Sequence, residues 1–230
     1  MNPLLLPIVA GQGIWVRSTI ESLPAAAGPD VGTVGDGSGQ LVRVAVVGES
    51  TAAGCGVDSH ADGFGGCLAR ELAARTGQPV GWQVVGQHGA TAHRIRHELV
   101  PRLGGELDVA VLLAGVNDVL TRRAPRHWGD DLAGIVDELL ARAERVVVCG
   151  VPPFQAFPSL PTTLRRYLAQ RATALDEVSQ QVCARRPRAS WLSSADILPA
   201  GQNIFARDGF HPSGIGYRYW AAAVAGHLDS

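Results

Sequence analysis

The chain has 230 residues and a mass of 24.1 kDa, of which 46% are hydrophobic and 18% charged. This composition is typical of one globular domain and too apolar for a disordered chain. The net charge of −1 creates no overall field that attracts nucleic acid or anionic lipid, which argues against a nucleic-acid partner. Every basic residue is Arg, so a lysine nucleophile, a Schiff base and a Walker lysine are all excluded.

Residues 1–16 form an apolar segment that contains Pro7. The segment is too short to span a bilayer and has no basic residue before its apolar run. We therefore expect no transmembrane span and favour a cytoplasmic location, with export as the alternative. Residues 1–40 are predicted to be an N-terminal extension that packs on the domain as an irregular strap. Its part at 24–40, rich in Gly, Ala and Pro, is predicted to be a loop, and residues 41–230 to form the main globular domain.

The four cysteines are scattered along the chain and form no Cys-x-x-Cys pair, so they indicate neither a zinc site nor a redox site. Their neighbours are typical of core positions, where Cys acts as a small hydrophobic residue. This pattern suits a reducing compartment. The cysteines are Cys55, Cys67, Cys149 and Cys183.

After residue 40, short β-branched runs alternate with segments of helical periodicity. Strands are predicted at Leu41–Val47, Gly81–Val85, Leu107–Leu113, Arg145–Val151 and Ala189–Leu192. Helices are predicted at 63–76, 92–103, 126–142, 162–185 and 213–228. This alternation indicates an α/β fold, a doubly wound three-layer α/β/α sandwich around a parallel sheet of about five strands. Ligands of such folds bind at the carboxyl ends of the strands.

Two of the predicted strands end in residues suited to acyl chemistry. Ser50 follows the first strand in Gly48-Glu49-Ser50-Thr51, so its hydroxyl and its N–H would face the open edge of the sheet. The alternative for Ser50 is a helix N-cap. Gly89 follows the second strand, and its backbone N–H can approach a ligand without a side chain in the way. The alternative for Gly89 is an ordinary turn glycine.

Two further segments at this edge carry polar side chains. Asn117 follows the third strand, and its amide is a donor that cannot lose its proton, as an oxyanion requires. The alternative is a turn residue that bonds its own backbone. Asp208 and His211 lie three residues apart before the last helix. A carboxylate at Nδ1 fixes the histidine tautomer and leaves Nε2 free to accept a proton; the alternative is a surface Asp–His contact.

Together these segments supply a nucleophile, a base, an orienting carboxylate and three oxyanion donors, the parts of acyl transfer. They also resemble, in the same order and over residues 42–220, the four conserved blocks of the SGNH (GDSL-type) hydrolase superfamily. Gly-Glu-Ser50 resembles the first block, Gly89 the second, Gly-Val-Asn117-Asp the third and Asp208-Gly-Phe-His211-Pro the fourth.

The resemblance implies a flavodoxin-like three-layer fold and hydrolysis of esters or thioesters without a cofactor or a metal. It implies that Ser50 is the nucleophile, that His211 is the base and that Asp208 orients His211. It also implies an oxyanion hole made of the N–H groups of Ser50 and Gly89 and the side-chain amide of Asn117.

Glu49 and a pair of histidines stand outside this pattern. The family usually has Asp before the serine, and we expect the extra methylene of Glu49 to change a neighbouring contact rather than the nucleophile. His93 and His97 are four residues apart on a predicted helix, a spacing that suits a metal. With no third ligand near them in the sequence, we predict a solvated helix surface and no metal site.

The segment 152–161, between the fourth strand and the next helix, is predicted to lie at the same edge of the sheet. Its apolar side chains Phe154, Phe157 and Leu160 are expected to line a substrate pocket. The alternative is a proline-stiffened loop that packs these side chains on the core.

We therefore expect a serine hydrolase that cleaves small-molecule carboxylic esters, of the esterase, lipase or deacetylase type, through an acyl-enzyme on Ser50. An acyltransferase or a thioesterase would use the same acyl-enzyme, and an SGNH-like binding domain without activity is a further alternative. A phosphate- or flavin-binding module is disfavoured, because Glu49 puts a carboxylate where phosphate would lie. No feature of the sequence specifies an oligomeric state.

Overall fold

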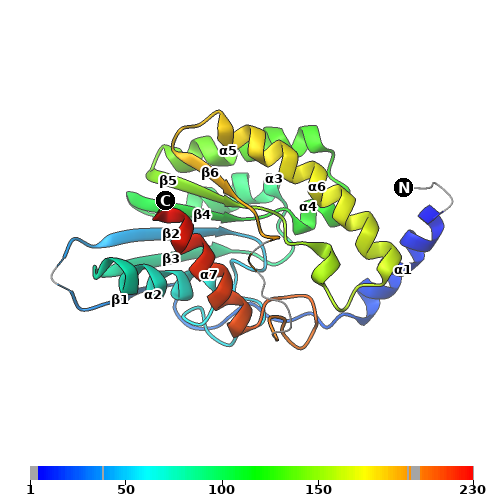
Figure 1. The fold of residues 1–230 in the computed structure, drawn as a ribbon, viewed down its shortest axis with the longest axis horizontal. Coiled ribbons are helices and arrows are strands. Elements are labelled where there is room, and N and C mark those ends of the chain that lie inside the picture. The colour runs from blue at the N-terminus through cyan, green and yellow to red at the C-terminus, as the bar shows by residue number, and fades with distance from the viewer. Residues whose placement is uncertain (1–4, 38, 196, 198–202, 230) are drawn as a thin grey trace.

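The sheet of this protein has six strands and lies between two layers of helices, as a computed structural model of residues 5–37, 39–195, 197 and 203–229 shows (Figure 1). The strands are β1 (Val31–Val34), β2 (Val42–Gly48), β3 (Val80–Gly86), β4 (Leu107–Leu113), β5 (Ala143–Cys149) and β6 (Ala189–Leu192). Their order is β1-β3-β2-β4-β5-β6, with β1 antiparallel to β3 and all other neighbours parallel. The predicted three-layer α/β fold is confirmed, with one strand more than expected.

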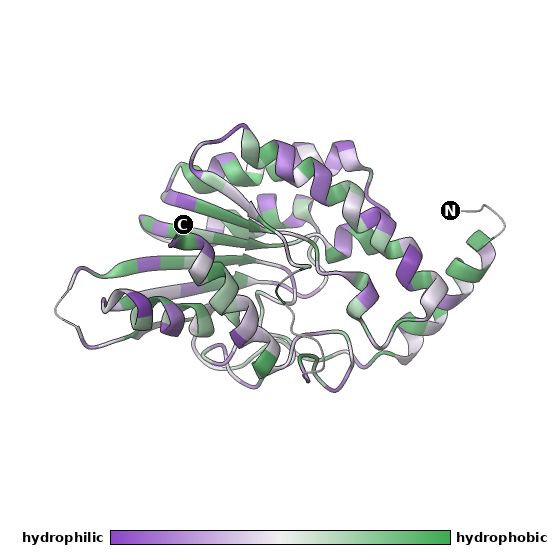
Figure 2. Ribbon diagram, viewed as in Figure 1, coloured by the Kyte–Doolittle hydropathy of each residue, from purple (hydrophilic) through white to green (hydrophobic). Residues whose placement is uncertain are grey.

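Helices cover both faces of the sheet because its central strands are apolar on both sides. Val44 and Val46 pack in one core with α2 and α7, whereas Ala45 and Val47 pack in a second core with α5 and α6. Figure 2 shows the apolar residues that run along these strands. The helices are α1 (Leu6–Thr19), α2 (Phe64–Thr76), α3 (Ala92–Arg94), α4 (Val116–Leu120), α5 (Pro125–Leu140), α6 (Thr162–Ala184) and α7 (Gly214–Leu228).

The N-terminal segment is more regular than the expected irregular strap. Residues 6–19 form α1, and Pro7 is tolerated because it lies in the first turn, where its missing N–H has no intrahelical partner to lose. Gln12 Oε1 accepts a hydrogen bond from the N–H of Leu164 at the start of α6, at 2.9 Å, and Val9 is buried. Other apolar residues of α1 stay exposed: Leu6, Ile8, Ile14 and Trp15.

The predicted loop at 24–40 contains the short edge strand β1, whose backbone pairs with β3. This pairing brings residues 31–34, which precede the predicted domain boundary at residue 40, into the sheet. The boundary itself stays a prediction. Residues 1–4 and 38 of the predicted extension lie outside the described residues. Within the described part of the chain, no helix combines the length and the apolar character needed to cross a bilayer.

The helix predicted at 92–103 is broken into three parts. After α3 the chain forms a π-helical turn, η2 (Ile95–Leu99), and then a 3₁₀ turn, η3 (Val100–Arg102). The reason is Pro101, which has no N–H to donate to the carbonyl of His97 one α-helical turn earlier. The N–H of Val100 instead bonds the carbonyl of Ile95.

Candidate active site

The strand order places a crevice at the carboxyl ends of β2 and β4. The chain passes from β2 to β3 on one side and returns to β4 on the other, so the order of the strands reverses beside β2. Such a reversal leaves a crevice at the carboxyl ends of the two strands. Ser50 lies two residues after β2, and Asn117 lies in the first turn of α4, four residues after β4. Both residues therefore flank the crevice.

The loop that carries Ser50 is fixed by backbone hydrogen bonds and by a close contact with the loop of His211. The N–H of Cys55 bonds the carbonyl of Ser50 at 3.0 Å, and the hydroxyl of Tyr217 from α7 donates to the carbonyl of Cys55 at 2.7 Å. Gly56 has φ +104°, and a Cβ there would lie 2.2 Å from the carbonyl oxygen of Pro212. Glycine at this position therefore lets the two loops approach each other.

The loop that carries His211 is a tight turn built on the side chain of Asp208. Asp208 Oδ1 accepts the N–H of Phe210 at 2.9 Å and that of His211 at 3.0 Å. Gly209, at φ +62°, closes the turn, and the hydroxyl of Ser159 donates to its carbonyl at 2.8 Å. These contacts leave Asp208 Oδ2 free to face the histidine ring.

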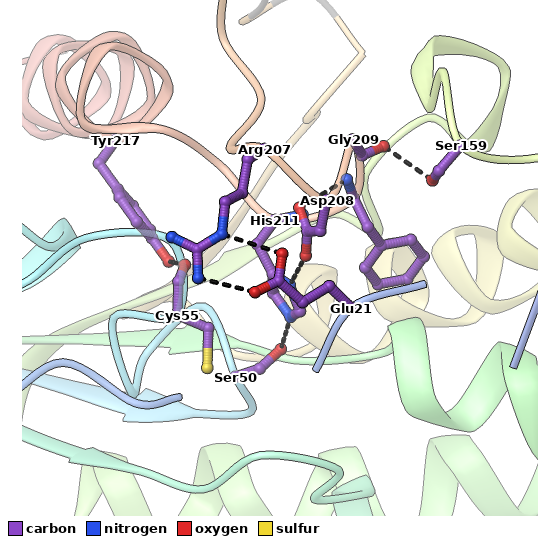
Figure 3. A network of polar contacts seen from close by, with 10 residues as sticks. Glu21, Ser50, Cys55, Ser159, Arg207, Asp208, Gly209, His211 and Tyr217 are labelled. Carbon is purple, nitrogen blue, oxygen red and sulfur yellow. Dashed lines mark hydrogen bonds and ion pairs between the residues drawn. The ribbon is translucent and has the colours of Figure 1, made fainter. Parts of the chain in front are cut away.

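The side chains of Ser50, His211 and Asp208 form one continuous line of hydrogen-bonding groups (Figure 3). His211 Nε2 is 3.0 Å from Ser50 Oγ, and His211 Nδ1 is 2.6 Å from Asp208 Oδ2. All three residues are buried. The structure thus brings together the three side chains that the sequence predicted at the strand edge and before the last helix.

The charge state of Asp208 determines which ring nitrogen of His211 carries the proton. Burial acts to raise the pKa of Asp208, but the hydrogen bonds from the His211 ring and from two backbone N–H groups outweigh it, so the pKa is lowered. An ionised carboxylate is only an acceptor, so Nδ1 of His211 carries the proton. Nε2 then offers its lone pair to the hydroxyl of Ser50.

The neighbouring Cys55 does not compete with Ser50 as a nucleophile. Burial raises the pKa of its thiol to about 11, so the reactive thiolate is scarce at neutral pH. The four cysteines are all buried and free, as their apolar flanks predicted.

Gly89 and Asn117, two of the residues expected to donate to an oxyanion, lie in different environments. Gly89 lies in an exposed turn at φ +76° with open space where a side chain would be, so its backbone is open to approach. The preceding residue, His88, has its ring 5.9 Å from that of His211, so this turn borders the site. Asn117 Nδ2 donates to Glu49 Oε2 at 2.6 Å and to the carbonyl of Ala90 at 3.1 Å.

Glu49, which follows β2, is hydrogen-bonded to the start of α4 across the crevice. Its buried carboxyl group accepts the backbone N–H groups of Val116 and Asn117, each at 3.1 Å, besides the side-chain amide of Asn117. Burial raises the pKa of Glu49 to about 8, although these donors favour the charged form. Glu49, which stands where the family usually has Asp, thus contacts Asn117 directly, while the effect of its extra methylene stays a prediction.

The raised pKa of Glu49 makes the protein less stable at higher pH. The native state keeps a proton between the ordinary pKa of 4.5 and about 8, which the unfolded chain has released. The free energy of unfolding should therefore fall with rising pH in this window, by up to about 1.4 kcal/mol per pH unit from this group. Glu49→Gln mimics the protonated carboxyl and should flatten that slope.

The measurement is urea unfolding of both proteins at pH 5.5, 7 and 8.5. Glu106→Gln, at an exposed position, serves as the control and should keep the wild-type slope. Equal slopes for wild type and Glu49→Gln would contradict the protonated state of Glu49.

A narrow apolar pocket adjoins Ser50 and His211, with a volume of about 40 Å³. Phe157 lines it, as expected. Phe154 and Leu160 do not, which corrects the prediction for these two residues: Phe154 is fully buried behind Phe157, with ring centroids 5.3 Å apart, and Leu160 is buried in the core. Further apolar lining residues come from other segments: Val116, Pro152, Ile197, Ile204, Phe205, Phe210, Pro212 and Trp220.

The site is thus a serine, a histidine and an aspartate at the carboxyl edge of a doubly wound sheet, the arrangement found in serine hydrolases. The sequence profile of the GDSL-like lipase/acylhydrolase family matches residues 46–219, and the chain belongs to this family.

Individual relatives are more distant. A GDSL-like esterase of Mycobacterium tuberculosis is 26% identical over 190 residues, which cover 76% of this chain and 58% of the relative. The chain therefore spans somewhat over half the length of that relative.

Solved structures share the fold. TesA superposes with a TM-score of 0.64 at 22% identity, covering 81% of this chain and 97% of that chain. A lipase/acylhydrolase from Enterococcus faecalis gives 0.60 at 19% identity, covering 81% and 95%. A carbohydrate acetylesterase from Sinorhizobium meliloti gives 0.61 at 16% identity, covering 82% and 98%.

Proposed function

We propose that this protein is a carboxylic ester hydrolase that acts through an acyl-enzyme on Ser50. The observation that carries the proposal is the line from Ser50 Oγ to His211 Nε2, at 3.0 Å, and from His211 Nδ1 to Asp208 Oδ2, at 2.6 Å. Membership of the GDSL-like lipase/acylhydrolase family supports the same activity.

The first step forms a bond between Ser50 Oγ and the acyl carbon of the ester. As this bond forms, the hydroxyl proton moves to His211 Nε2, and Asp208 stabilises the resulting imidazolium. The tetrahedral intermediate then collapses, the alcohol leaves with the proton from His211, and the acyl group stays on Ser50. Water, activated by the same histidine, releases the acid and restores Ser50.

The oxyanion formed in this step needs donors aimed at its oxygen. The backbone N–H groups of Ser50 and Gly89 and the amide of Asn117 are the proposed donors. Asn117 already donates to Glu49 and to the carbonyl of Ala90. In the proposed transition state, one amide hydrogen of Asn117 would therefore be shared between the oxyanion and one of these two acceptors.

Replacing Asn117 with alanine separates a catalytic role from a structural one. If the amide stabilises the oxyanion, kcat should fall about 10²–10³-fold with KM little changed, because the contact forms only in the transition state. Steady-state hydrolysis of p-nitrophenyl acetate measures both constants. Glu106→Gln, at an exposed position away from the crevice, is the control and should keep kcat. A fall of tenfold or less would assign Asn117 to holding the loop.

The pocket favours a small acyl group. Its interior is small, about 40 Å³, and its lining is largely apolar. The substrate proposed here is therefore a small-molecule ester with a short acyl chain, such as an acetyl ester. A carbohydrate acetylesterase is among the proteins that share the fold.

The test of the proposed function joins covalent labelling to a substrate series. A fluorophosphonate probe should label wild type on Ser50 and should not label Ser50→Ala, while Ser18→Ala, at an exposed serine of α1, keeps the labelling. On p-nitrophenyl esters from acetyl to octanoyl, kcat/KM should be highest for acetyl. Labelling that persists in Ser50→Ala would overturn the nucleophile.

The same experiment distinguishes the alternatives. Labelling without hydrolysis of any ester, but with transfer to an added alcohol, would indicate an acyltransferase. Faster turnover of acyl thioesters would indicate a thioesterase. The absence of both labelling and turnover would indicate a binding domain.

A further inference from the structure

A cluster of three potential metal ligands lies on the helical layer that carries α3 and α5. The side chains of His93, His97 and Asp131 each offer one ligand atom, and these atoms all lie within 4.8 Å of one another. The third ligand comes from α5, more than thirty residues after His97 in the sequence. The structure thus supplies the ligand that the sequence analysis did not find beside the two histidines.

The geometry of the cluster suits a tetrahedral metal. His93 Nδ1 and Asp131 Oδ1 are 3.3 Å apart. This contact is a long hydrogen bond in the structure, and its length equals the separation of about 3.3 Å between two ligands that lie about 2.0–2.1 Å from a tetrahedral metal. The rings of His93 and His97 are 4.5 Å apart by their centroids, and both side chains are exposed, so they can rotate toward a shared ion.

The backbone around the cluster is held in place from both sides. Asp118 Oδ2 accepts the N–H of Ala92 at 2.9 Å, which anchors the residue before His93. His97 lies in the π-helical turn η2, an irregularity often found at functional sites. Asp131 is buried, and its Oδ2 is paired with the guanidinium of Arg123. This pairing leaves Oδ1 facing the histidines and fixes the orientation of the carboxylate.

We propose that His93, His97 and Asp131 form a binding site for a divalent transition metal, with Zn²⁺ as the ion it takes. A set of two imidazoles and one carboxylate suits Zn²⁺ better than it suits Mg²⁺ or Ca²⁺. A fourth coordination position stays open to water. The nearby guanidinium of Arg123 limits the affinity, because it repels the cation. The ion would join the start of α3 to α5, and it takes no part in the chemistry proposed at Ser50.

The experiment is calorimetric titration of Zn²⁺ into the full chain without a polyhistidine tag, after treatment with a chelator. We expect one Zn²⁺ per chain with a micromolar dissociation constant and no binding of Mg²⁺. His93→Ala and His97→Ala should each weaken binding at least about tenfold. Both side chains are exposed, so these variants should keep the fold, which circular dichroism checks.

Two further variants serve as controls. His127→Ala removes an exposed histidine of α5 outside the cluster and should bind Zn²⁺ as wild type does. His88→Ala tests the other neighbouring pair of histidines, His88 and His211, and should also bind normally. The proposal is overturned if wild type shows no saturable binding, if His97→Ala binds as tightly as wild type, or if only His88→Ala loses binding. The readout is binding, so it is independent of the proposed esterase activity.

Discussion

Replacing Ser50 with alanine, or His211 with glutamine, should each lower kcat for p-nitrophenyl acetate by about 10⁴–10⁶-fold. Ser50→Ala removes the oxygen that forms the acyl-enzyme. His211→Gln keeps a side chain of similar size in this buried position but cannot accept the proton from Ser50 Oγ, 3.0 Å away. The residual rate would come from binding and from the oxyanion donors alone.

The double variant provides the stricter test of this pair. Two residues that act in the same step are strongly non-additive, because loss of either already abolishes the step. The double variant should therefore be no more than about tenfold slower than either single variant. Ser18→Ala and His127→Ala, both at exposed positions, should keep the wild-type kcat. Losses that multiply in the double variant would mean that Ser50 and His211 act independently.

The layers of the fold follow from the sequence because the central strands are continuous apolar runs. Residues such as Val46 and Val47, on opposite faces of β2, require cover on both sides. The edge strand β1 could not be predicted in this way. Its four residues lie in a glycine-rich segment and show little hydrophobic periodicity, and its pairing partner β3 is distant in the sequence. The helix α1 could not be predicted either, because its apolar residues are not confined to one face of the helix.

The site shows a similar division. Ser50, Asp208 and His211 could be predicted because each lies next to a recognisable strand end or helix start, where parallel strands gather their loops. The hydrogen bonds between Glu49 and Asn117 could not be predicted, because they join the ends of β2 and β4, 68 positions apart in the sequence. Which apolar residues of 152–161 face the pocket also depends on the path of the loop, and this is why the sequence left open whether Phe154 and Leu160 face the pocket or the core.

The role of Asp208 leads to a second large effect. Asp208→Asn should lower kcat by about 10⁴-fold near neutral pH while the turn stays folded. The reason lies in the two oxygens of the carboxylate. Oδ1 accepts the N–H groups of Phe210 and His211, so the amide oxygen of an asparagine should keep this position. The amide NH₂ would then replace Oδ2 and face His211 Nδ1.

An NH₂ group can only donate, so Nδ1 would become an acceptor and the ring proton would move to Nε2. In that tautomer Nε2 has no lone pair for the proton of Ser50. Nitrogen NMR of the His211 ring reports the tautomer directly and should show the proton on Nδ1 in wild type and on Nε2 in the variant. Asp30→Asn, at an exposed position, is the control and should leave both kcat and the tautomer unchanged. A variant with the wild-type tautomer and near-normal kcat would show that Asp208 only shapes the turn.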